Sequence, residues 1–191
     1  MKVWLFLIGI VGSGLVMAEP VINTKTQHYE FNAKSRQQIW QHIRRAGDSV
    51  QLNNGSQHWV TVAWTAYDLQ LEYRLSVALY QCRLYSYTPT LNVTITLPHW
   101  KNKWEADPVL AENWDNYVRM VAQHESVHKQ YAIKMAHELD KRLSEIGIMK
   151  SCREVKEEVQ KVRDQVFAEN KANNKWFDAK ERVYQQKLRW F

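Results

Sequence analysis

The sequence predicts an α+β fold in which a small antiparallel sheet packs on a long helix and on a second, C-terminal helix. Three observations predict it. Residues 59–97 are rich in Val, Thr, Tyr and Trp and alternate with the period of two that is typical of strands. Residues 108–146 carry apolar side chains at helical spacing, with no Gly and with Pro only at the first position. The helical pattern returns after Ser151.

The elements before the sheet are short. Residues 26–32 are predicted as a strand. Ser35 then offers the hydroxyl that a helix N-cap favours, and the helix after it carries Ile39, Trp40 and Ile43 on one side until Gly47 ends it. The Asn-Asn-Gly-Ser run at residues 53–56 predicts a turn before the sheet.

About three strands are predicted between residues 59 and 97. Proline has no N–H to donate to a sheet, so Thr88-Pro89-Thr90 is predicted as the turn before the last strand. For the same reason we expect Pro98 to end that strand.

The second half of the chain is predicted to be helical. Pro108 suits the first turn of a helix that runs to Ile146, with Gly147 as its C-cap. We expect the second helix to weaken at residues 170–174, and a tail beginning at Trp176-Phe177-Asp178 to turn back on the core. Its apolar stripe consists of Val155, Val159, Val162, Val166 and Phe167.

The N-terminus has the pattern of a secretory signal peptide over residues 1–18. Lys2 precedes an apolar run from Val3 to Val16, and Ala18 provides the small residue at the cleavage site. The run is too short for a convincing transmembrane anchor, and no other segment approaches the roughly 20 apolar residues of a membrane span. We therefore expect an exported protein, periplasmic or secreted, with residues 19–191 forming one domain.

The cysteines and the net charge of the chain indicate its compartment and its partners. Cys82 and Cys152 are predicted to form a disulfide, because exported proteins reach an oxidising compartment; two buried thiols are the alternative. The net charge of the full chain, +6, favours anionic surroundings such as cell-envelope polymers or acidic lipid surfaces. Acidic residues interleave with the basic ones and no groove-reading motif occurs, so nucleic acid is not an expected partner.

The most specific motif is His124-Glu125-Ser126-Val127-His128, which matches H-E-x-x-H on the predicted long helix. Residues four apart share one helix face, so both imidazoles can reach one metal ion while Glu125 activates a water. The motif therefore predicts a zinc hydrolase. Two histidines that are exposed, or satisfied within the core, are the alternative.

The mature chain resembles DUF922, a bacterial family of exported, predicted zinc-dependent proteases grouped with the zincin peptidases. The resemblance implies a zincin-like fold and a peptidase activity with undefined substrates. One departure concerns the end of the chain, where the family has a His-Gly pair and this sequence has Val183-Tyr184. The resemblance rests on the motif, the two cysteines, residues 97–100, Trp114, Tyr117 and Phe177-Asp178-Ala179.

A catalytic zinc site generally has three protein ligands, and the motif supplies only two. Neither His137 nor Glu138 can be the third, because they lie too far along the same helix at 1.5 Å per residue. Asp178 is the predicted third ligand, since it falls in the stretch that resembles the family; a capping or solvated aspartate is the alternative. Glu181 is the next choice, and Glu154, Glu158 and Glu169 also remain open.

These residues predict a mechanism. Zinc on His124, His128 and Asp178 would activate a water, Glu125 would move its proton to the leaving amine, and a peptide or protein of the cell envelope would be the substrate. Tyr117, Arg182 and Tyr184 are candidate donors to the oxyanion. The alternatives are a catalytically inactive binding or structural module of the envelope and a hydrolase of cell-wall peptides.

Overall fold

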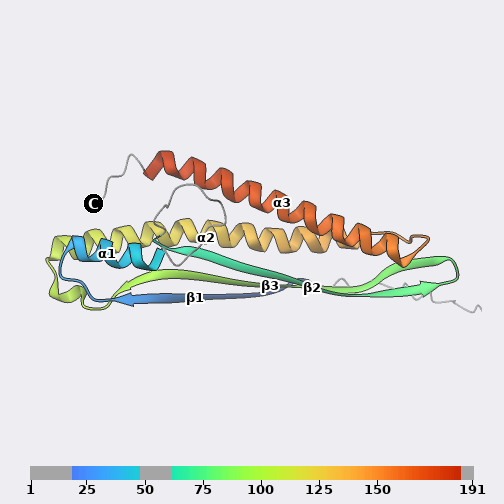
Figure 1. Cartoon of the computed structure of the whole chain (residues 1–191), viewed down its shortest axis with the longest axis horizontal. Coiled ribbons are helices and arrows are strands. Elements are labelled where there is room, and N and C mark those ends of the chain that lie inside the picture. The colour runs from blue at the N-terminus through green and yellow to red at the C-terminus, as the bar shows by residue number, and fades with distance from the viewer. Residues whose placement is uncertain (1–18, 48–61, 186–191) are drawn as a thin grey trace, which may run out of the picture.

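The computed structural model of the chain describes residues 19–47 and 62–185, and side chains as far as residue 181 (Figure 1). The predicted signal peptide, the turn at residues 53–56 and residues 186–191 lie outside this part. Within it, the protein is α+β, and none of its helices is both long and apolar enough to cross a membrane. The elements are β1 (Val21–Phe31), α1 (Arg36–Gly47), β2 (Trp64–Ala78), β3 (Gln81–Trp100), the short 3-10 helix η1 (Lys103–Glu105), α2 (Pro108–Ser144) and α3 (Cys152–Gln185).

The sheet has three strands in the order β1-β3-β2, and it is mixed rather than antiparallel. β2 and β3 form an antiparallel hairpin, whereas β1 pairs with β3 in parallel, from Val21 opposite Thr90 to Phe31 opposite Trp100. The prediction of an antiparallel sheet was wrong for β1. Parallel neighbours need a long connection, and here α1 and β2 lie between the two strands in the chain.

Two prolines that were predicted to lie at the two ends of the last strand lie within it. β3 runs without a break through Pro89 and Pro98, so the predicted turn at residues 88–90 and the predicted end at Pro98 were wrong. Pro89 precedes the part of β3 that pairs with β1, and Pro98 follows the part that pairs with β2. At each proline β3 thus has a strand on one side only, where a missing N–H is tolerated.

Both long helices are continuous. Asp107 caps α2 by accepting hydrogen bonds from the backbone N–H groups of Val109 and Leu110, and Pro108 occupies the first turn as predicted. α2 ends at Ser144, two residues before the predicted end. α3 passes through residues 170–174 and 178 without a break, so the predicted weakening and returning tail were wrong.

The helices and the sheet enclose two apolar clusters. α2 lies along the sheet, and α3 runs back along α2 in the opposite direction (Figure 1). One cluster joins all three layers through side chains such as Leu91, Leu139 and Val159. The other gathers around Trp100 and Trp114, near the start of α2. Along α2, the residues from 124 to 128 lie between the two clusters.

A disulfide joins Cys82 to Cys152, as predicted. It ties the start of β3 to the start of α3. Beside it, Cys82 and Met149 exchange two backbone hydrogen bonds of 2.8 and 2.9 Å. The direction in which α3 leaves the sheet is therefore fixed by covalent and hydrogen bonds together, and a disulfide is compatible with an exported protein.

Candidate metal centre

His124 and His128 lie one turn apart on α2, and their rings meet at the surface that faces α3. Their Nε2 atoms are 3.0 Å apart and their ring centroids 4.7 Å apart. Both rings are partly buried. The helical spacing of four residues thus places two imidazole nitrogens next to each other.

Asp178 reaches the same point from α3. Its Oδ1 lies 3.0 Å from Nε2 of His128 and 3.5 Å from Nε2 of His124. Four atoms around a tetrahedral zinc ion lie about 3.3 Å apart, since zinc–ligand distances are about 2.0 Å. In the described part of the chain, these three residues form the group of potential metal ligands, and their ligand atoms all lie within 4.8 Å of one another.

The other carboxylates considered for the third position lie elsewhere. Glu169 forms a two-pronged ion pair with Arg142, and Glu154 accepts a hydrogen bond from the backbone of Lys150 at the start of α3. Glu158 pairs with Lys161 on the same helix. Glu181 does not belong to the group.

Asn174 holds the His128 ring from behind. Its Oδ1 accepts a hydrogen bond from Nδ1 of His128, while its Nδ2 donates to the backbone oxygen of Asn170 at 2.8 Å. The buried Asn170 in turn donates to the hydroxyl of Tyr67 on β2. The sequence prediction missed these residues and took the asparagines as signs of a weak helix. Asn170, Asn174 and Asp178 are four residues apart and therefore share one face of a helix, and this spacing was the available signal.

Phe177 packs against both histidines. Its ring stacks on His124 at 4.9 Å and lies edge-on to His128 at 5.4 Å. Nδ1 of His124 is buried and has no hydrogen-bond partner among the described residues. The position of that ring therefore depends on packing against Phe177 and on the contacts of its Nε2 with His128 and Asp178, because Nδ1 makes no hydrogen bond.

The carboxyl of Glu125 contacts the sheet at β2. The Thr65 hydroxyl of β2 lies 2.8 Å from its Oε2 and 3.0 Å from its backbone oxygen. Burial raises the pKa of the Glu125 carboxyl, and the hydrogen bond from Thr65 and the nearby histidines offset only part of that rise. Glu125 is thus a buried carboxylic acid close to the group formed by His124, His128 and Asp178.

Hydrogen bonds and charges within the group shift the pKa values of His128 and Asp178. Burial lowers the pKa of His128, but hydrogen bonds to Asp178 and Asn174 and the nearby negative charges raise it by more. Burial raises the pKa of Asp178, yet hydrogen bonds from both histidines keep it well below its usual range. The site therefore favours an ionised aspartate, which is the form that binds metal.

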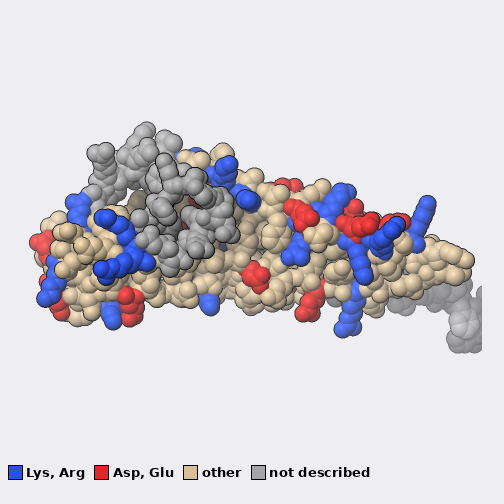
Figure 2. All heavy atoms as spheres, in the orientation of Figure 1, with Lys and Arg blue, Asp and Glu red and all other residues tan. Residues whose placement is uncertain are grey.

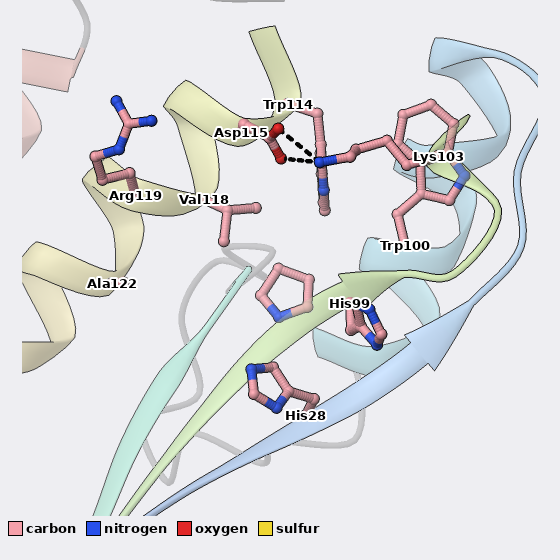
Figure 3. Close-up of a pocket in the computed structure, with 10 residues that line it drawn as sticks. His28, His99, Trp100, Lys103, Trp114, Asp115, Val118, Arg119 and Ala122 are labelled. Carbon is pink, nitrogen blue, oxygen red and sulfur yellow. Dashed lines mark hydrogen bonds and ion pairs between the residues drawn. The ribbon is translucent and has the colours of Figure 1, made fainter. Parts of the chain in front are cut away.

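The remaining candidates do not join the group. The Tyr117 ring packs on Trp40 and Trp114 in the second cluster, and burial raises its pKa to about 12. The side chains of Arg182 and Tyr184 lie outside the described part. A cavity of about 460 Å³ opens along α2 between Trp114 and Ala122, but none of the four site residues lines it (Figure 3).

Fold and site together define an α+β protein whose two long antiparallel helices bring two histidines and an aspartate to one point. Residues 26–186 match the family described as bacterial protein of unknown function, DUF922. That span covers most of the chain, and the protein belongs to this family, as its sequence predicted. No curated protein and no solved structure matches the chain.

Proposed function

We propose that this protein is an exported, zincin-like metallopeptidase that hydrolyses peptide bonds in the cell envelope with a zinc ion and Glu125. The observation that carries the proposal is the convergence of two Nε2 atoms and one carboxylate oxygen beside a buried glutamate. A buried acid next to a metal-ligand set is the arrangement that metal-assisted hydrolysis requires.

The donor set fits zinc. His124, His128 and Asp178 would be the three protein ligands, which is the number that catalytic zinc sites use. Zinc bound there would supply a Lewis acid that activates water and polarises a carbonyl. Two histidines and a carboxylate also suit iron, but Glu125 favours hydrolysis, because it offers a general base that oxygen chemistry does not need.

Glu125 is the residue that would accept a proton from the attacking water and return it to the leaving amine. Its raised pKa suits both steps, since a base works best when its pKa approaches the working pH. Thr65 holds the carboxylate in place through the 2.8 Å hydrogen bond.

β2 is the strand that would align a substrate. It lies at one edge of the sheet, and its residue Thr65 contacts Glu125 directly. An extended peptide that added to this edge would run beside the site, and its backbone would bind without a demand for particular side chains. A peptide or protein substrate is therefore favoured over a small molecule.

The competing function is a binding or structural module without activity. The same three side chains also contact one another directly, at 3.0 to 3.5 Å, as an ionised aspartate with protonated imidazole would. In that case the cluster would only hold α2 against α3, and a metal would not be needed.

The test is hydrolysis of a peptide mixture, read by mass spectrometry, by the parent protein and by Glu125→Gln. The parent should cleave, and the variant should keep its metal yet lose at least about 100-fold in rate. Glu138→Gln, on the same helix but paired with Arg142, is the matched control and should cleave normally. Equal cleavage by Glu125→Gln, or none by the parent, would leave the inactive module as the better description.

A further inference from the structure

The turn between β2 and β3 exposes large apolar side chains at the end of the molecule. The loop consists of Leu79 and Tyr80, between Ala78 and Gln81, which pair with each other. It lies beyond the connection from α2 to α3 (Figure 1). The surrounding apolar side chains that are 62% to 84% exposed are Val77, Leu79, Tyr80, Tyr85 and Ile148.

The backbone of the turn adopts an unfavourable conformation for the residues it contains. Tyr80 has φ of 60°, in the left-handed region that favours glycine, and it is the non-glycine residue with positive φ in the described part. Two-residue hairpin loops favour Asn-Gly or Asp-Gly. Neither folding nor solubility explains Leu-Tyr at this position, so the pair is better explained by contact with something outside the chain.

The charges on the hairpin itself are basic. Residues 74–85 contain two basic residues and no acidic one, whereas Lys150 and Arg153 in the segment that joins α2 to α3 lie beside Glu154 and Glu157. On the face shown in Figure 2, the extreme end of the molecule is free of charged side chains, and both basic and acidic side chains lie a short way behind it. The basic residues are Arg74, Arg83, Lys150 and Arg153.

We propose that this apolar turn inserts into the headgroup region of a membrane that contains anionic lipid. Tyrosine and aliphatic side chains backed by basic residues match the chemistry of that interface, where aromatic rings and cations both bind favourably. A protein partner fits less well, because a standard interface buries about 800 Å² per partner and a projecting two-residue loop offers little of that.

Such an anchor would set the position of the candidate metal centre. Thr65 contacts Glu125, and the same strand continues to Val77 at the turn. At about 3.3 Å per residue, the site would stand about 40 Å from the turn. The inference does not rest on the proposed activity, because the turn contains no residue of the metal group.

Vesicle sedimentation tests the inference with the exported full chain. Vesicles of phosphatidylethanolamine with phosphatidylglycerol should bind the protein, and bind it less as salt is raised. Leu79→Asn with Tyr80→Gly should weaken binding at least about tenfold, since two inserted side chains are lost. Arg83→Gln with Lys150→Gln should weaken binding and reduce its salt dependence. Trp104→Ser, an exposed residue of η1 after the opposite end of β3, should bind as the parent does.

Leu79→Asn with Tyr80→Gly is not expected to disturb folding. Asn-Gly is the favoured loop sequence and glycine accepts a φ of 60°, so its thermal midpoint should equal or exceed that of the parent. The proposal is overturned if the parent does not bind these vesicles or if Leu79→Asn with Tyr80→Gly binds them equally well. A crosslink from the turn to a protein, without vesicle binding, would likewise overturn it in favour of a protein partner. Zinc content should be the same in all these variants.

Discussion

The side-chain oxygen of Asn174 accepts a hydrogen bond from Nδ1 of His128, and the opposite nitrogen of that ring therefore faces His124 and Asp178. The direction of the Asn174 amide is not arbitrary, because its nitrogen donates to Asn170. Metal-binding histidines commonly have such a partner, which fixes the ring and its protonation state. An asparagine on α3 thus orients a candidate metal ligand on α2.

Asn174→Ala should weaken zinc binding by about 10- to 100-fold, the usual effect of removing the partner of a ligating histidine. Competition with a chromophoric chelator measures the affinity. Asn174→Asp keeps an acceptor and should retain most of the affinity. Asn173→Ala, the exposed neighbour, is the matched control. An affinity equal to that of the parent in Asn174→Ala would show that the hydrogen bond does not position His128.

The disulfide should account for a large part of the stability. Replacing Cys82 and Cys152 by Ala should lower the free energy of unfolding by about 4 kcal/mol, because the bond closes a loop of 70 residues in the unfolded chain. Urea denaturation of both forms measures the difference. A change below about 1 kcal/mol would mean that the backbone pairing of Cys82 with Met149 holds α3 without the bond.

The part of the site that follows from local spacing could be predicted from the sequence. His124 and His128 needed only a helix, and the apolar pattern of α2 predicted one. Asp178 was chosen from the family resemblance. It was predicted to lie on a tail that turns back on the core, but it lies on the continuous helix α3. Asn170 and Asn174 have low helix propensity, but the difference is below about 1 kcal/mol per residue, and the burial of Val155, Val159, Val162 and Val166 outweighs it.

The sheet shows where sequence patterns fail. Pro89 gave a strong turn signal, although it lies in β3 where one side of the strand has no neighbour. The real turn, Leu79-Tyr80, carries no Gly, Asn, Asp or Pro and gave no signal. The parallel pairing of β1 depends on contacts between residues about 70 positions apart, which no local pattern contains.

Alkaline pH should destabilise the protein through two partly buried tyrosines. Burial raises the pKa of Tyr117 to about 12 and that of Tyr29 above its usual range. The unfolded chain releases these protons near pH 10 and the folded chain releases them later. The stability they contribute is thus complete below pH 10 and is lost as the pH rises, by up to about 1.4 kcal/mol per pH unit for each tyrosine.

Tyr29→Phe checks this slope. The variant should be less stable by about 1 kcal/mol at neutral pH, because the Tyr29 hydroxyl donates to the backbone oxygen of Val62 at 2.8 Å. Its stability should fall less steeply above pH 10, as measured by urea denaturation at several pH values. Parallel pH curves for the variant and the parent would contradict the prediction.

The most direct measurement is the zinc content of the purified protein after dialysis against trace zinc, determined by elemental analysis. We predict one zinc per chain in the parent and in Glu169→Ala, a control that removes a carboxylate of α3 paired with Arg142. His124→Ala and Asp178→Ala should each lose the metal. A parent protein without zinc, or full zinc retention in both variants, would contradict a metal centre formed by His124, His128 and Asp178.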